Sequence, residues 1–99
     1  MIARLKIITT KEGTESQFET LFNKLDTYVK VNEPNSISHE LYRSPKNTRN
    51  YVVVEKYTDQ SAVDIHTDSE RKFFNEIIPL LESVTLQTST KFEEMSIPN

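Results

Sequence analysis

Three ionisable side chains with the chemistry of an acid–base site, Glu55, Tyr57 and His66, fall within one short stretch of the chain. An apolar run, residues 51–54, leads into Glu55 and Tyr57, and a helical pattern that contains His66 follows directly. A strand followed at once by a helix brings such residues together, because the helix packs against the sheet that the strand joins. We therefore expect these three groups to lie close to one another.

His66 and Glu55 each have two interpretations. His66 could act as a general base on a phenolic or enolic hydroxyl, since its ordinary pKa of about 6.5 suits proton transfer near neutrality. It could instead be a packed histidine that bonds Glu55 and ties the helix to the sheet. Glu55 would correspondingly orient and activate the imidazole or only satisfy its hydrogen bonding.

Two further side chains have a structural and a functional interpretation. Tyr57 could hydrogen-bond an oxygen-rich ring, or bury its own ring with the hydroxyl at the rim of a pocket. His39 alternates with Ile37 and Leu41, so we expect a satisfied core or interface histidine rather than a metal ligand or catalytic group.

The motifs of several common reaction types do not occur in this sequence. No spacing of His, Asp and Glu predicts a metal site, no glycine-rich loop could hold phosphates, and no serine lies in a nucleophile elbow. Chemistry without a cofactor remains: an electron-rich hydroquinone or phenol, once deprotonated, can pass an electron directly to O2. Such a reaction needs a base, a dry pocket and hydrogen-bond donors.

Composition and length limit the class of protein. The 99 residues suit one domain, for which we expect an ordered core of about residues 2–95, and the lack of cysteine excludes disulfides and thiolate zinc sites. The net charge is −3 and the 12 Lys and Arg residues are scattered, which indicates no nucleic-acid surface. Since neither a membrane-length apolar run nor a signal peptide is recognisable, we expect a cytoplasmic protein without membrane contact.

Hydrophobic periodicity predicts the elements. Thr14 and Gln17 have the spacing of a capping box at a helix start, and Pro34 ends that helix. Asp59 and Ser69 could cap two short helices. Pro79 predicts a kink or an early end of the second of them. Alternation predicts the strands 2–10, 36–43, 51–57 and 83–95, the second near an edge and the third central.

The resulting order, β-α-β-β-α-β, is that of an α+β ferredoxin-like fold with a four-stranded antiparallel sheet and both helices on one face. The other face carries aliphatic and aromatic side chains over a larger area than monomers usually expose. We therefore expect a homodimer formed through the sheet face.

With this order, five segments of the sequence resemble the antibiotic biosynthesis monooxygenase (ABM) family, and the resemblance spans nearly the whole chain. These segments are Glu33-Pro34, residues 40–45, residues 51–57, Ala62 and His66-Thr67-Asp68-Ser69. The resemblance implies a dimeric α+β barrel with a small pocket between the sheet and helices of each subunit. It also implies several chemistries, among them cofactor-free oxygenation of quinols and aromatic polyketides, haem degradation, and isomerisation of a phosphorylated signalling sugar derivative.

The chain departs from the family at positions that bear on function. A second histidine common shortly after the His66 segment is replaced by the run 70–72, which speaks against a two-histidine site. Haem-degrading members have a helix histidine where this chain has Glu76 and a tryptophan where it has Tyr57. Haem is therefore disfavoured.

The leading hypothesis is a cofactor-independent monooxygenase that oxidises a small aromatic or quinol substrate with O2. Its base would be the pair His66 and Glu55, and Tyr57, Phe22 and Phe73 would wall the pocket. We expect neither a metal nor another cofactor. Two alternatives stay open: an isomerase that uses the same pair for proton transfer, and a non-catalytic dimer that binds a small ligand.

Overall fold

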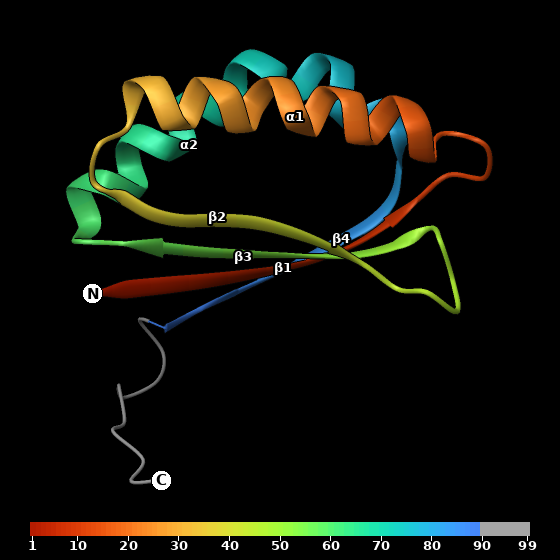
Figure 1. Ribbon diagram of the computed structural model, residues 1–99, viewed down its shortest axis with the longest axis horizontal. Helices are drawn as coiled ribbons and strands as arrows, with labels where there is room; N and C mark the ends of the chain where they lie inside the picture. Colours follow the sequence, from red (N-terminus) through yellow and green to blue (C-terminus); the bar gives the residue numbers. More distant parts are fainter. Residues whose placement is uncertain (90–99) are drawn as a thin grey trace, which may run out of the picture.

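The computed structural model describes residues 1–89, which form a four-stranded antiparallel sheet with two helices on one face (Figure 1). The order β-α-β-β-α-β confirms the predicted ferredoxin-like arrangement. The elements are β1 Ile2–Thr10, α1 Glu15–Asn32, β2 Ser36–Arg43, β3 Asn50–Tyr57, α2 Gln60–Ile77, a 3-10 turn Ile78–Leu80 and β4 Leu81–Thr88.

The strands lie in the order β2-β3-β1-β4, so β2 is an edge strand and β3 is central, as predicted. The register pairs Arg4 of β1 with Glu55 of β3, and Glu55 with His39 of β2. Directly paired residues of antiparallel strands have their side chains on the same face. Arg4, Glu55 and His39 therefore form one row across the side of the sheet that faces the helices.

Helix α1 begins after Gly13, whose φ of 81° lies in the left-handed region that glycine adopts readily. The predicted capping box is wrong, because the Thr14 hydroxyl donates to the carbonyls of Lys11 (2.7 Å) and Leu80 (3.0 Å) and makes no side-chain cap bond. These bonds tie the start of α1 to the 3-10 turn. The helix ends at Asn32, shortly before Pro34, as predicted.

Helix α2 is continuous, so the prediction of a new start at Ser69 is wrong. Asp59 is the predicted N-cap and accepts a bond of 2.9 Å from the backbone N–H of Ala62. The Ser69 hydroxyl donates to the carbonyl of Ile65 (3.1 Å) instead of capping. Pro79 follows the end of the helix in the 3-10 turn, as its position predicted. One unbroken helix places residues 66 and 70 one turn apart on the same side.

Strand β4 forms the second edge of the sheet and ends at Thr88. The rest of the predicted final strand, residues 90–95, and the end of the expected ordered core lie outside the described residues. Within residues 1–89, no helix is long and apolar enough to cross a membrane.

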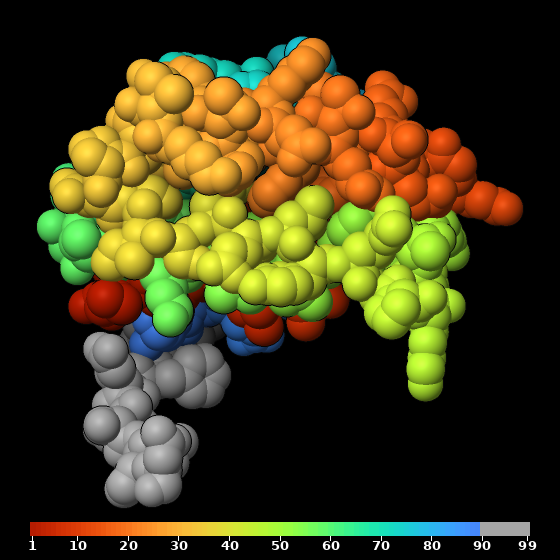
Figure 2. Space-filling view, in the orientation of Figure 1, coloured from red at the N-terminus to blue at the C-terminus, as the bar shows by residue number. Residues whose placement is uncertain are grey.

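The two faces of the sheet differ in what covers them. Figure 2 shows α1 lying over β2, and on this covered side packs the main apolar cluster, Ile8, Phe18, Leu21, Phe22, Tyr51, Val53 and Leu80. On the opposite face, Leu5, Ile7 and Tyr42 are 36%, 47% and 55% exposed. The alternation of the strands thus leaves exposed apolar side chains on the face that the helices do not cover.

Candidate active site

A group of charged side chains, which we call the ion cluster, lies between the sheet and α2. Strand β1 supplies Arg4 and Lys6, β3 supplies Glu55, and α2 supplies His66 and Glu70. The sixth member, Glu33, follows the last turn of α1. Side chains two apart on β1 and four apart on α2 share a face, so each of these two elements presents its charged pair on one side. All six are buried or nearly so.

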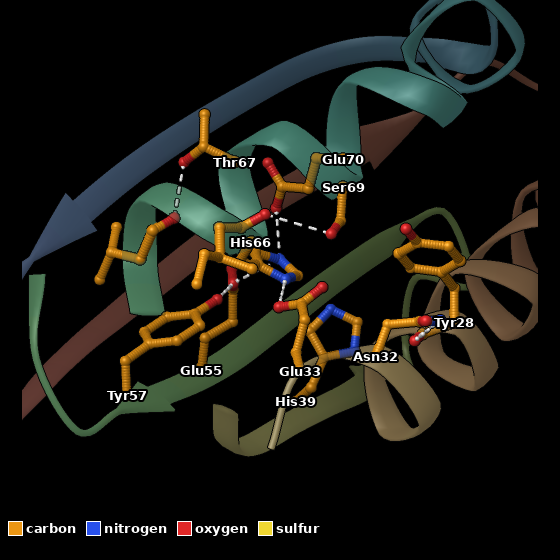
Figure 3. A network of polar contacts seen from close by, with 12 residues as sticks. Tyr28, Asn32, Glu33, His39, Glu55, Tyr57, His66, Thr67, Ser69 and Glu70 are labelled. Carbon is orange, nitrogen blue, oxygen red and sulfur yellow. Dashed lines mark hydrogen bonds and ion pairs between the residues drawn. The ribbon is translucent and has the colours of Figure 1, made fainter. Parts of the chain in front are cut away.

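His66 is at the centre of the ion cluster and has no exposed surface (Figure 3). Its Nδ1 is 2.9 Å from Glu33 Oε1, and its Nε2 is 2.8 Å from Glu70 Oε1 and 3.1 Å from Glu55 Oε2. Burial alone would lower the pKa of His66, but hydrogen bonds and charges from Glu55 and Glu70 outweigh it and raise the pKa to about 9. At neutral pH His66 is therefore an imidazolium that donates from both nitrogens.

Arg4 and Lys6 balance the remaining carboxylate charge. Arg4 lies 3.2 Å from both Glu55 and Glu70, and Lys6 lies 3.2 Å from Glu55 and also bonds Glu70. Burial would raise the pKa of both carboxyl groups, but His66 and Lys6 hold each pKa below its ordinary value, and Arg4 also does so for Glu55. Three carboxylates thus face three cations, which is the condition under which buried charges are tolerated.

Tyr57 belongs to the same cluster as a hydrogen-bond donor. Its ring is fully buried and its hydroxyl donates to Glu55. Burial and the negative charge of Glu55 raise the pKa of Tyr57 far above its ordinary value. The phenol therefore stays protonated and donates to the Glu55 carboxylate alongside Arg4 and His66.

A cavity of about 260 Å³ adjoins the ion cluster. Three polar side chains reach its wall, namely Lys6, His39 and Glu70. The rest of the lining is apolar: Ile8, Phe18, Phe22, Leu25, Val53, Phe74, Ile77, Ile78, Leu81, Val84 and Leu86. Ile78, Val84 and Leu86 are each about half exposed, so the cavity opens between the end of α2 and strand β4.

His39 lies where the cavity meets the ion cluster. Its ring stacks on that of Phe22, with 4.8 Å between centroids and 3° between planes, and lies 5.1 Å from the ring of His66. Its Nδ1 is 3.0 Å from Asp26 Oδ1 of α1. Burial and the positive charge of His66 lower its pKa, and the bond to Asp26 only partly offsets them. His39 is therefore neutral at neutral pH, unlike its neighbour.

Comparison with known proteins agrees with this fold. The family model described as "Antibiotic biosynthesis monooxygenase" matches residues 1–71, which include every member of the ion cluster. The chain belongs to this ABM family. No curated protein matches the sequence significantly.

Solved structures similar to this ABM chain share its fold. A protein of Shewanella oneidensis is 28% identical with a TM-score of 0.79, over 88% of this chain and 86% of that one. A Caulobacter crescentus protein, described as a candidate antibiotic biosynthesis monooxygenase, is 24% identical with a TM-score of 0.81, over 88% and 85%. A third, described as an antibiotic biosynthesis monooxygenase, is 19% identical with a TM-score of 0.81, over 99% and 100%.

The structure brings together some of the residues that the sequence singled out in this ABM chain. His66, Glu55 and Tyr57 are in contact, and Phe22 lines the cavity. Tyr57 and Phe73 lie outside the set of described residues that form the cavity wall. Phe73 instead packs edge-on against Tyr28 of α1, 6.2 Å between centroids. The next residue, Phe74, lies about 100° further around the helix and lines the cavity, the position predicted for Phe73.

The sequence interpretation missed Arg4, Lys6, Glu33 and Glu70, and undervalued His39. The sequence contained a signal for three of these residues, Arg4, Lys6 and Glu70. Arg4 and Lys6 share a strand face with buried Ile8, an unusual place for unpaired cations. Glu70 stands four residues after His66, the spacing of facing side chains on a helix. Glu33 follows a helix end, where no periodicity indicates its direction.

One grouping has the spacing of a metal site. Among residues 1–89, ligand atoms of His39, Glu55 and His66 all lie within 4.8 Å of one another. However, both nitrogens of His66 already donate to carboxylates, and Glu55 already accepts from Arg4 and Lys6. A divalent cation would have to replace these bonds next to two fixed positive charges. The donor set fits a network of ion pairs and hydrogen bonds better than a metal centre.

Proposed function

We propose that this ABM protein is a cofactor-independent monooxygenase that oxidises a small aromatic or quinol substrate with O2. The observation that carries the proposal is an apolar cavity whose polar wall consists of Lys6, His39 and Glu70. A volume of about 260 Å³ is slightly below the roughly 300 to 1,000 Å³ of drug-sized ligand sites and suits a small ring system. The aromatic side chains Phe22 and Phe74 offer contacts to its faces.

The polar wall suits a substrate that must become an anion. A hydroxyl near Lys6 would lose its proton, and the ammonium group would stabilise the resulting oxyanion in a site with little water. The ion cluster holds Lys6 in place through Glu55 and Glu70, so little reorganisation accompanies the appearance of charge. An electron-rich anion of this kind is the species able to reduce O2 without help.

The proposed reaction balances with O2 as the only co-reactant. The phenolate passes one electron to O2, and the ring radical and superoxide combine at a ring carbon that carries hydrogen. Loss of water from the hydroperoxide leaves a carbonyl at that carbon, and the hydroxyl proton removed earlier leaves with this water. A phenol and O2 thus give a quinone and water.

Within this proposal the pair His66 and Glu55 has a different role from the one expected from sequence. An imidazolium whose pKa is raised to about 9, with carboxylates on both nitrogens, is a poor proton acceptor at neutral pH. We assign His66 and Glu55 to holding Lys6 and Glu70 in position behind the cavity wall. Tyr57 supports Glu55, and Phe22 remains a proposed substrate contact.

The test is oxygen uptake by chelator-treated protein with a panel of hydroquinones and polyhydroxylated aromatics. We expect uptake with at least one substrate, and a fall of roughly 100-fold in kcat for Lys6→Met, which keeps the stem but removes the charge. Lys11→Met, on the exposed turn before α1, is the matched control, and circular dichroism verifies that both variants fold. A wild type that takes up no oxygen with any substrate would contradict the proposal.

A second candidate function is an isomerase or enolising enzyme. Neutral His39 and the charged groups Lys6 and His66 lie within one site, and a base beside proton donors is what proton transfer between two carbon positions requires. Such an enzyme would convert a ketone or enol substrate under nitrogen as fast as in air. If the protein shows neither oxygen uptake nor isomerisation, the non-catalytic ligand-binding dimer is the alternative that remains.

We also propose that two copies associate through the open sheet face. Leu5, Ile7 and Tyr42 expose apolar surface there, and Val52 and Val54 of β3 lie between them. Ile7→Glu should convert a dimer into a monomer in light scattering. Ile65→Glu, at a position equally exposed (50% against 47%) but on the helix side, should leave the mass unchanged. A monomeric wild type would contradict this arrangement.

A further inference from the structure

His39 is a side chain of the cavity wall that no family motif of the sequence includes. Its side chain is only 4% exposed, and β2 directs it to the helix-facing side in register with Glu55. Phe22, another wall residue, stacks flat on the imidazole and restricts its rotation. The ring is therefore held rigidly at the edge of the space that a substrate would occupy.

Asp26 determines which nitrogen of His39 carries the proton. The Asp26 carboxylate lies 3.0 Å from Nδ1, and Lys30 holds the same carboxylate through its other oxygen at 2.7 Å. A carboxylate accepts and does not donate, so neutral His39 must carry its hydrogen on Nδ1. Within residues 1–89, Nδ1 is the ring nitrogen with a hydrogen-bond partner, which leaves the lone pair of Nε2 available.

The other candidate proton acceptors of the site are already protonated or are held at a low pKa. Glu70 accepts from Lys6, Arg4 and His66, and Lys6 and His66 hold its pKa below the ordinary value. Glu55 is held likewise and lies outside the described wall residues. His66 donates from both nitrogens. His39 is the one group of the described wall that is both neutral and without a donor at its second nitrogen.

We propose that His39 is the general base of the proposed oxygenase and that Asp26 is its positioning residue. The substrate O–H bond breaks, an Nε2–H bond forms, and the electron pair stays on the substrate oxygen beside the Lys6 ammonium. The Asp26 carboxylate then stabilises the imidazolium through Nδ1–H. This inference rests on the proposed function, since it names the group that starts that reaction.

The electrostatic surroundings of His39 favour the neutral starting state. The charged groups that face it are Asp26 with Lys30 on α1, Glu55 on β3, His66 and Glu70 on α2, and Lys6 on β1. Burial first, and the His66 charge next, keep the pKa of His39 below 6.5. Activity should therefore rise with pH as His39 loses its proton, and the acid limb of kcat/KM should lie below pH 6.5.

The experiment compares His39→Gln, Asp26→Asn and the control Thr27→Ala, at an exposed position of α1 next to Asp26. We expect kcat/KM to fall at least roughly 100-fold in His39→Gln, with loss of the acid limb, and added imidazole to restore part of the activity of His39→Ala. Asp26→Asn removes a contribution that raises the pKa of His39, so its acid limb should move to lower pH. An unchanged rate and acid limb in His39→Gln would overturn the inference while leaving the oxygenase intact.

A binding measurement tests His39 even without turnover. Nitrocatechol changes its absorption when it ionises, so its spectrum reports which form is bound. Below its own pKa we expect the wild type to bind it as the anion and His39→Gln to bind it as the neutral phenol. A wild type that binds only the neutral form, or does not bind the probe, would overturn the inference. If the wild type binds the anion but takes up no oxygen with any substrate, only the proposed oxygenase is overturned.

Discussion

The space between the sheet and the helices has two halves that are built from the same strands with opposite chemistry. In β1, Ile8 faces the apolar half, whereas Arg4 and Lys6 face the ion cluster. In β3, Val53 belongs to the apolar half, and Glu55, two residues later, to the cluster. The cavity lies on the boundary between the halves, which gives a substrate an apolar wall on one side and fixed charges on the other.

The two histidines at this boundary show what the difference does to one type of side chain. His66 lies among carboxylates and is charged, and His39 stacks on Phe22 and is neutral, although their rings are only 5.1 Å apart. Two titratable groups whose surroundings move their pKa values apart can hold a proton donor and an acceptor in one site at one pH. The boundary therefore supplies acid and base together.

The largest predicted effect comes from removing one charge from the ion cluster. Glu55→Ala leaves Arg4, Lys6 and His66 facing two carboxylates, and an uncompensated buried charge should cost roughly 3 to 5 kcal/mol of unfolding free energy. Leu21→Ala in the apolar half should cost a similar amount, roughly 2 to 5 kcal/mol, through its cavity. Urea unfolding at several pH values separates them.

Only the Glu55→Ala loss should change with pH, because the cavity left by Leu21→Ala alters no ionisation. Glu12→Gln, at an exposed carboxylate on the turn before α1, is the control and should remain within about 0.5 kcal/mol of wild type. A Glu55→Ala protein as stable as this control would contradict the description of the cluster as mutually dependent charges.

The next effect is a pair of opposite pH dependences. The folded pKa of His66, about 9, exceeds its unfolded value of 6.5, so its stabilisation is complete below pH 6.5 and is lost as pH rises through about 9. The full difference is on the order of 3 kcal/mol. The folded pKa of His39 is lowered, so its contribution is present above pH 6.5 and is lost as pH falls below it.

His66→Gln and His39→Gln should therefore flatten different limbs of the stability curve. The first variant should remove the decline between pH 6.5 and about 9, and the second should reduce the decline just below pH 6.5. Urea midpoints measured across both ranges provide the comparison. The contributions of Glu55 and Glu70, whose folded pKa values are lowered, are fully present above about pH 4.5 and are lost only below it, so they do not interfere. Declines of the same sign for both histidines would disprove their opposite charge states.

The sequence predicted the elements well because periodicity is a local signal. Alternation identified β1, β2 and β3, and the order of elements was enough for the ferredoxin-like fold. The start predicted at Ser69 failed because a serine inside a helix can bond the carbonyl four residues before it, as Ser69 does with Ile65. Local propensity cannot tell such a residue from a cap.

The site was less predictable because its members meet through register and helix phase. The pairing of Arg4 with Glu55 depends on which residues of β1 and β3 lie opposite each other. The choice between Phe73 and Phe74 depends on the continuous phase of α2, which the assumed break at Ser69 obscured. The role of His39 depends on Asp26, thirteen residues earlier on another element, and no spacing rule connects them.

The smallest predicted effect concerns the ion pair Asp68–Arg71, on the exposed side of the stretch of α2 that carries His66 and Glu70. Its atoms are 3.0 Å apart, closer than Arg4 and Glu55, but the two side chains are 74% and 67% exposed. Water and salt screen such a pair, so Arg71→Ala should change the unfolding free energy by about 0.5 kcal/mol or less. The same urea titration that detects Glu55→Ala measures it. A loss comparable to that of Glu55→Ala would mean that the proximity of two charges, rather than their burial, determines how much an ion pair contributes to stability.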